Sequence, residues 1–140
     1  MLLSERDSAR RFFLSVWDKH REGKLLEPLE AMVLDVVLMH PEYHPLLEEG
    51  EAVLERDWEI GEGVTNPFLH MGLHVALAEQ VGADRPAGVT QIYRRLSRRL
   101  GDRHEAEHRM MGVLAGMLWE AQRSGLPPDE GDYLEALRRL

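Results

Sequence analysis

Apolar and polar positions alternate along most of the chain with the period of an α-helix. Phe12 and Val16 lie four residues apart on one apolar stripe, which predicts a helix over about 5–22. Pro28 suits the first turn of a second helix, and Pro41 disfavours helical geometry at the residue before it and so ends that helix.

The second half of the chain carries start and stop signals for four more helices. Each predicted helix begins near a proline or an acidic capping residue, and three of them end at a glycine. The predicted ranges are about 66–81, 86–100, 103–123 and a short last helix within "LPPDEGDYLEALRRL". Strand-like alternation never persists. The expected fold is therefore all-α, a compact single-domain bundle of about five to six helices over residues 1–140.

Residues 41–66 interrupt this regular pattern. They combine two prolines, three glycines and most of a crowded acidic cluster, which predicts an irregular connection with room for a short helix over about 51–57. A connection this long is unusual inside a small domain and is often functional. The acidic 48–62 segment is therefore a candidate surface for a protein partner.

Composition narrows the function classes. The chain has 140 residues, no Cys and a net charge of −8, which excludes disulfides and thiolate metal ligands and argues against nucleic-acid binding. The one basic run, "RRLSRRLGDR", is expected to form a solvated helix face. No apolar run approaches membrane-spanning length, and "MLLSERDSARR" lacks the apolar core of a signal peptide, so we expect a cytoplasmic protein with no membrane association.

Histidines provide the strongest chemical signal. The chain has seven, and six of them form three pairs at spacing four: His40 and His44, His70 and His74, His104 and His108. Residues i and i+4 share one face of a helix, so such a pair can bind one metal ion with two imidazoles. Pro41 prevents the first pair from sharing a helix, and that pair should behave differently from the other two.

Helix direction predicts where the pairs meet. Suppose that successive helices run in alternate directions. If the 41–66 connection also starts the next helix at the end of the bundle where the second helix stops, all three pairs gather at that end. His20 should then lie at the other end. The helix over about 66–81 is apolar nearly all round, so its two histidines should be buried and require partners.

These patterns predict a metal-binding helical protein. The expected primary ligands are His70, His74, His104 and His108, followed by His44 and then His40. Imidazole-rich sites suit divalent zinc, iron, nickel or copper. The nearby acids Glu42 and Glu107 are expected to be surface carboxylates.

No catalytic residue and no organic cofactor site can be named from the sequence. It has no glycine-rich phosphate loop, GxSxG motif or HExxH motif. The alternative interpretation is a non-enzymatic interaction protein, whose histidines are structural and satisfied internally.

Several runs resemble a bacterial family catalogued as domain of unknown function 1841. They are "HPEYH", "NPFLHMGLH", "DRPAG", "GDRHEAEH" and "LWEAQRSGLPPDE", and the resemblance covers about Arg11 to Leu140. It implies a small soluble bacterial protein. It implies no established activity and supplies no catalytic residue.

Overall fold

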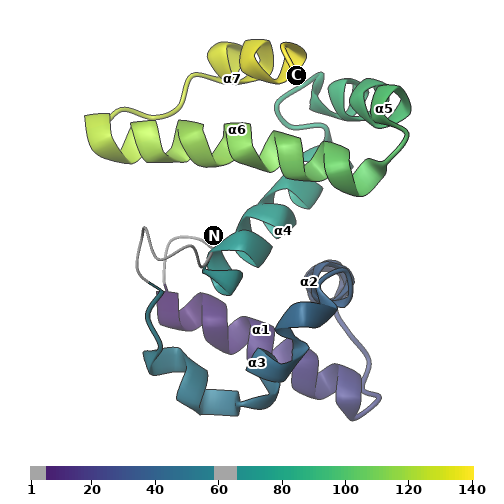
Figure 1. The fold of residues 1–140 in the computed structure, drawn as a ribbon, viewed down its shortest axis with the longest axis vertical. Coiled ribbons are helices and arrows are strands. Elements are labelled where there is room, and N and C mark those ends of the chain that lie inside the picture. The colour runs from purple at the N-terminus through teal and green to yellow at the C-terminus, as the bar shows by residue number, and fades with distance from the viewer. Residues whose placement is uncertain (1–5, 59–65) are drawn as a thin grey trace. The chain divides into compact units, whose positions relative to one another are not determined.

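The computed structural model describes residues 6–58 and 66–140, and within these ranges every regular element is helical (Figure 1). The prediction of an all-α protein is confirmed. The elements are α1 (Arg6–Arg21), α2 (Pro28–Leu38), η1 (Pro41–Tyr43), α3 (His44–Glu48), η2 (Gly50–Glu55), α4 (Pro67–Ala83), α5 (Val89–Leu100), α6 (Arg103–Ser124) and α7 (Glu130–Arg138), where η marks a 3-10 helix. The described residues contain no helix that is both long and apolar enough to cross a membrane.

The chain divides into two compact units, residues 1–75 and 76–140, and the boundary falls within α4. Each unit is described by itself.

Residues 41–58 are more regular than the sequence predicted. Three short helices, η1, α3 and η2, follow one another here, which is why the described residues contain more than the expected five to six helices. Local propensity does not explain them, because Pro41, Pro45 and Gly50 interrupt the segment. Burial of Leu47 and Val53 in the core stabilises these short turns instead. The rest of the expected irregular connection includes residues 59–65, which lie outside the described part.

Capping signals account for most helix ends. Pro28 occupies the first turn of α2, and Glu27 and Glu30 form a capping box there. The α6 helix begins at Asp102, whose carboxylate accepts hydrogen bonds from two backbone amides, and ends at Gly125 with φ of 75°. Ser4, the expected cap of the first helix, lies outside the described residues.

The start of α5 differs from the prediction. Pro86 was expected to open this helix, but α5 begins at Val89. The reason is the turn before it, in which the Asp84 carboxylate accepts hydrogen bonds from the backbone amides of Gly88 and Thr90, each at 3.1 Å. An acid at this position satisfies amides that the first turn of a helix leaves unpaired.

The first unit has one continuous apolar core. Helix α1 packs against α2, α3 and η2, and the first half of α4 contributes side chains to the same cluster. The cluster includes Phe13, Val16, Trp17, Val33, Val36, Val37, Leu47, Val53, Phe68, Met71 and Val75.

A buried arginine lies beside this core. Arg10 of α1 is only 3% exposed, and its Nη1 donates to the carbonyl oxygens of Val53 at 3.1 Å, Leu54 at 3.2 Å and Arg56 at 2.7 Å. These carbonyls lie at and just after the C-terminal end of η2, where helix carbonyls have few backbone donors, and the Val53 carbonyl also accepts from the Arg56 amide at 3.2 Å. The guanidinium therefore caps η2 and connects it to α1.

The same guanidinium also contacts two aromatic rings. Its Cζ lies 5.2 Å from the ring centroid of Trp58 and 5.2 Å from that of Phe68, within cation–π range. Phe68 belongs to the first turn of α4. Arg10 therefore fixes the beginning of α4 relative to α1.

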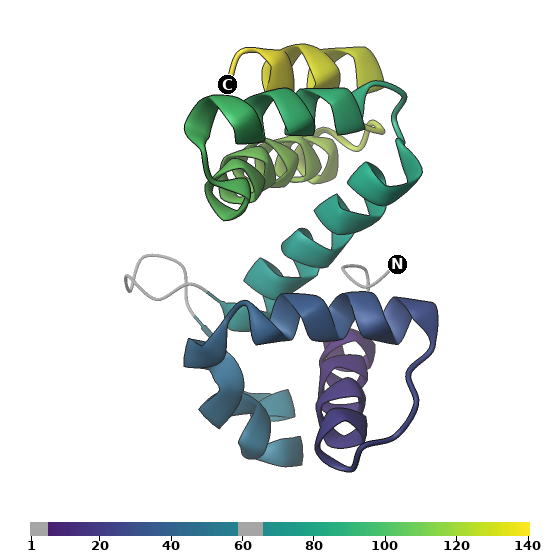
Figure 2. The same cartoon turned by 90° about the vertical axis from the view of Figure 1, so that its right-hand side faces the viewer.

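The second unit is built from α5, α6, α7 and the C-terminal part of α4. Each of the helices α5, α6 and α7 packs against the other two (Figures 1 and 2). Their buried side chains are Val89, Ile92, Leu96, Ala106, Met110, Met111, Leu114, Tyr133 and Leu137.

Two polar contacts tie α4 into this unit. Tyr133 donates a hydrogen bond to Gln80 at 2.6 Å, and Thr90 donates to the Val81 carbonyl at 2.6 Å. Burial raises the pKa of Tyr133 to about 12, so this phenol remains a donor at neutral pH.

Replacing Arg10 should destabilise the first unit strongly. In Arg10→Ala, three buried carbonyls lose a charged donor, and we expect a loss of about 3 kcal/mol in the free energy of unfolding. Urea unfolding followed by tryptophan fluorescence measures it, because Trp17 and Trp58 report on this unit.

The neighbouring Arg11→Ala is the matched control. Arg11 is exposed and forms a surface ion pair with Glu51 at 3.2 Å, so its loss should cost under about 1 kcal/mol. Equal destabilisation by the two variants would contradict the capping role of Arg10.

Candidate metal centre

His40 sits where α2 ends. Pro41 stops the helix, and His40 takes non-helical backbone angles of φ −125° and ψ 65°. Its ring folds back, with Nδ1 2.7 Å from the Val36 carbonyl oxygen. A carbonyl oxygen only accepts, so Nδ1 carries the hydrogen. In the neutral ring, Nε2 therefore presents a lone pair, which is the form that binds a metal.

The α4 pair lies beside this ring. His70 and His74 are one helical turn apart, with ring centroids separated by 6.4 Å. Asn66 begins the helix, since its side chain accepts hydrogen bonds from the amides of Phe68 and Leu69. The predicted local geometry of an i,i+4 pair is therefore present.

The imidazole of His40 lies close to both rings of this pair. Its centroid is 4.8 Å from that of His70 and 5.3 Å from that of His74, and both ring planes are nearly perpendicular to it. Each residue offers one ring nitrogen, and these three nitrogens lie within 4.8 Å of one another. His40 and His74 are 2% and 1% exposed, and His70 is partly buried, so the cluster is largely but not fully removed from solvent. We call His40, His70 and His74 the three-histidine cluster.

The closest pair of nitrogens has the spacing of metal ligands. The Nε2 atoms of His40 and His70 are 3.1 Å apart. Two imidazole nitrogens on one tetrahedral ion, each bound at the usual length, would be about 3.3 Å apart. The cluster therefore fits a transition ion with only small side-chain adjustments, and all three of its ligands would be neutral.

Tyr43 forms one wall of the cluster. Its ring stacks on His40 at 5.4 Å with an interplanar angle of 9°, and lies 6.2 Å from the ring of His70. Burial, followed by the negative charge of Glu42, raises the pKa of the Tyr43 phenol. Near pH 7 the side chain is thus a neutral phenol that packs against the ligands. The sequence pattern did not connect Tyr43 to the histidines.

His44 lies elsewhere in the first unit. Its Nε2 is 2.8 Å from the Val37 carbonyl oxygen, and its ring is 4.6 Å from that of Trp17. Among the described residues it does not belong to the three-histidine cluster. The two histidines of "HPEYH" are thus separated by the turn that Pro41 begins, as the sequence indicated.

The expected position of His20 is wrong in one respect. His20 was predicted to lie at the opposite end from His44, but both imidazoles contact the same indole, and the His20 ring is 5.6 Å from that of Trp17. The reason is that the short helices after His40 bring His44 back against α1 rather than leaving it at the end of α2.

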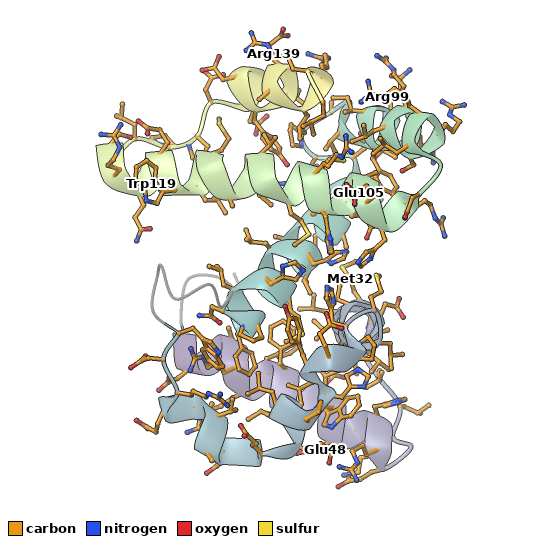
Figure 3. The ribbon with its side chains drawn as sticks, in the orientation of Figure 1. Met32, Glu48, Arg99, Glu105, Trp119 and Arg139 are labelled. Atoms are coloured by element: carbon orange, nitrogen blue, oxygen red, sulfur yellow. The ribbon has the colours of Figure 1, made fainter. Side chains whose placement is uncertain are left out.

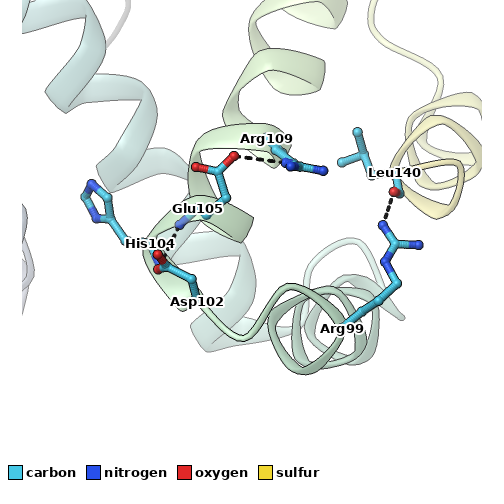
Figure 4. A network of polar contacts seen from close by, with 6 residues as sticks. All are labelled: Arg99, Asp102, His104, Glu105, Arg109 and Leu140. Carbon is cyan, nitrogen blue, oxygen red and sulfur yellow. Dashed lines mark hydrogen bonds and ion pairs between the residues drawn. The ribbon is translucent and has the colours of Figure 1, made fainter.

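The α6 pair is found in the second unit. His104 and His108 lie one turn apart with ring centroids separated by 4.1 Å, and both are partly buried. Asp102 accepts hydrogen bonds from the backbone amides of His104 and Glu105, which orients this first turn (Figure 4).

Glu107 contributes a carboxylate to the same face. One of its oxygens lies within 4.8 Å of a ring nitrogen of His104, and Glu107 also accepts a hydrogen bond from Tyr93 at 3.0 Å. Each unit therefore contains a histidine pair at i,i+4 spacing with a tyrosine nearby.

Much of the acidic 48–62 segment is already paired within the first unit. Glu48 accepts a hydrogen bond from the Trp17 indole and pairs with Arg21, while Glu49 pairs with Arg56. Glu51 pairs with Arg11. Glu59 and Glu62 lie outside the described residues. Glu48, Glu49 and Glu51 therefore serve contacts inside the first unit.

A family model described as Domain of unknown function (DUF1841) matches residues 5–139, nearly the whole chain. The chain belongs to this family. No curated protein and no solved structure gives a significant match. The family description names no activity, so the function of this member has to be argued from its own residues.

The geometry predicts opposite tautomers for two histidines only four residues apart. His40 should be neutral with hydrogen on Nδ1, and His44 with hydrogen on Nε2, because these are the atoms that face the Val36 and Val37 carbonyls. Nitrogen NMR of the metal-free protein above about pH 7.5, where imidazoles are usually neutral, distinguishes the two forms. Hydrogen on Nε2 of His40 would contradict the arrangement of the proposed ligand.

Proposed function

We propose that this protein binds a divalent transition metal through His40, His70 and His74. The observation that carries the proposal is the convergence of three ring nitrogens within 4.8 Å, two of them 3.1 Å apart. The contact of the His40 Nδ1 with the Val36 carbonyl supports it further. Metal-bound histidines usually donate their other N–H in this way, which fixes the tautomer and the ring orientation.

A simple hydrogen bond explains less of this arrangement. One N–H···N bond could account for the 3.1 Å separation of His40 and His70. Such a bond joins only two imidazoles, whereas a metal ion can accept all three. Bringing three imidazoles together in a shielded site also costs desolvation, which metal coordination offsets more fully than one hydrogen bond does.

The ligand set limits the choice of metal and of chemistry. Neutral imidazole nitrogens suit zinc, iron, nickel and copper, and the absence of Cys excludes a thiolate-type structural zinc site. Three protein ligands are also typical of catalytic metals, which keep a position for water or substrate. When bound, such an ion would supply Lewis-acid or redox chemistry, while the protein residues hold it and shield it from water.

Metal binding should raise the thermal stability of the protein. A ligand that binds only the folded state contributes about 4 kcal/mol at a thousandfold excess over its Kd, or on the order of 10 °C in Tm. Chelator treatment should lower the Tm, and one of zinc, iron, nickel and copper should restore it at about pH 7.5. The restoration should fade below about pH 6, where imidazoles take up protons. Elemental analysis of untagged protein gives the stoichiometry.

Single variants identify the ligands. His70→Ala should abolish the metal-dependent rise in Tm, because the remaining cluster is left with two imidazoles. His20→Ala is the matched control: His20 is exposed and contacts Trp17, so the metal response should stay unchanged. If no stoichiometric metal is found and none of the four ions changes the Tm, the metal proposal is wrong. The histidines are then structural, and the protein-interaction alternative replaces it.

The sequence also predicted that His104 and His108 act as metal ligands, and we retain this as part of the proposal. As a pair within the second unit they would form a separate metal site, and the double variant His104→Ala/His108→Ala should then lower the number of metal ions bound per chain. Titration calorimetry on the metal-free protein measures this stoichiometry. An unchanged stoichiometry would restrict metal binding to the first unit.

A further inference from the structure

The second unit contains a large groove, with charged side chains along its lining, that the metal proposal does not use. It has a volume of about 1510 Å³ and is open to solvent. It is lined by the end of α4, the turn after it, one face of α5 and the beginning of α6. Cavities for drug-sized ligands usually occupy about 300–1,000 Å³, so this groove has room for an elongated ligand.

Three arginines line this groove. Arg94 and Arg98 are one helical turn apart on α5, so they point along the same face, and Arg103 comes from the first turn of α6. All three are exposed. Within residues 6–58 and 66–140, none of them forms a close ion pair, although Asp84 attracts Arg94 at longer range.

The acids of the groove are engaged by the backbone. Asp84 accepts from the amides of Gly88 and Thr90, and the contact with Thr90 is the main reason that its pKa is lowered. Asp102 caps α6 through two backbone amides (Figure 4). These hydrogen bonds hold both carboxylates in place, and the three arginines outnumber them, so the lining of the groove carries a net positive charge.

Several other arginines of the second unit have partners of their own. Arg99 donates to the backbone carbonyl of Leu140, and Arg109 pairs with Glu105 at 3.0 Å (Figure 4). Arg123 pairs with Glu120, and its Cζ lies 5.5 Å from the ring centroid of Trp119. The Trp119 side chain is exposed (Figure 3). The groove arginines differ from these because their donors are not committed to a neighbouring acid or carbonyl.

We propose that this groove binds a small soluble ligand carrying several phosphate groups. Guanidinium groups donate in pairs to phosphate oxygens and do so better than single-point cations. The three guanidinium groups, two on α5 and one on α6, suit a ligand with several linked anionic groups better than a single small anion. Thr90, Gln91 and Tyr93 lie along the same groove and offer polar side chains for the rest of such a ligand.

A nucleic acid fits the molecule less well. The net charge of the chain is −8, which repels a long polyanion that extends beyond the groove. A short phosphate-bearing ligand contacts the groove alone and avoids this repulsion. Arg94, Arg98 and Arg103 belong to the basic run that was expected to form a solvated helix face. In this proposal they bind a ligand instead.

Titration calorimetry with sodium tripolyphosphate tests the proposal. The protein is used metal-free, because this probe chelates metals. At low ionic strength we expect a Kd below about 100 μM, and Arg94→Ala/Arg98→Ala should raise it at least about tenfold. The matched control is Arg95→Ala/Arg139→Ala, which removes the same charge from exposed positions outside the groove and should change the Kd by less than about threefold.

Each remaining outcome is decisive. If the two double variants raise the Kd for tripolyphosphate equally, binding reflects general electrostatic attraction, and the proposed site is wrong. A Kd above about 1 mM, or tighter binding of a single-stranded oligonucleotide than of tripolyphosphate, would also overturn it. His70→Ala should bind the probe as the parent protein does, so failure of the metal proposal and failure of this one are separately visible.

Discussion

The guanidinium of Arg10 joins four parts of the first unit: α1, the end of η2, the segment that contains Trp58, and the first turn of α4. It donates to three carbonyls at and just after the C-terminal end of η2, and it lies against the rings of Trp58 and Phe68. A buried cation is costly unless its donors are satisfied. This charge can therefore be buried only when these segments come together, which couples the short helices to the start of α4.

The three-histidine cluster depends on that coupling. His70 follows Phe68 by two residues on α4, so the position of its ring is set by the same contact that fixes the beginning of the helix. His40 approaches from the end of α2, where Pro41 and the Val36 carbonyl determine its orientation. A metal site needs ligands fixed by their surroundings. Here a backbone carbonyl orients one ligand, and helix geometry places the other two.

The two proposed sites differ in burial, in charge and in the atoms that they offer to a ligand. The histidine cluster is largely buried and offers imidazole nitrogens, and it suits a cation that prefers nitrogen ligands. The groove of the second unit is open and cationic, with its carboxylates occupied by backbone amides. In an otherwise acidic chain, the proposed groove would concentrate anion binding on the second unit. The ordinary surface arginines, paired with nearby acids, contribute little to this selectivity.

Local patterns in the sequence determined the helices and the i,i+4 pairs, because helical periodicity, caps and side-chain spacing act within a few residues. His70 and His74 could be placed on one face of a helix for that reason. The tertiary structure alone decided that His40 rather than His44 lies beside them, and that His44 and His20 share Trp17. It also decided that residues 41–55 form short helices, whose apolar side chains are buried by distant parts of the unit. These outcomes depend on contacts between residues far apart in the chain, and helical periodicity carries no information about them.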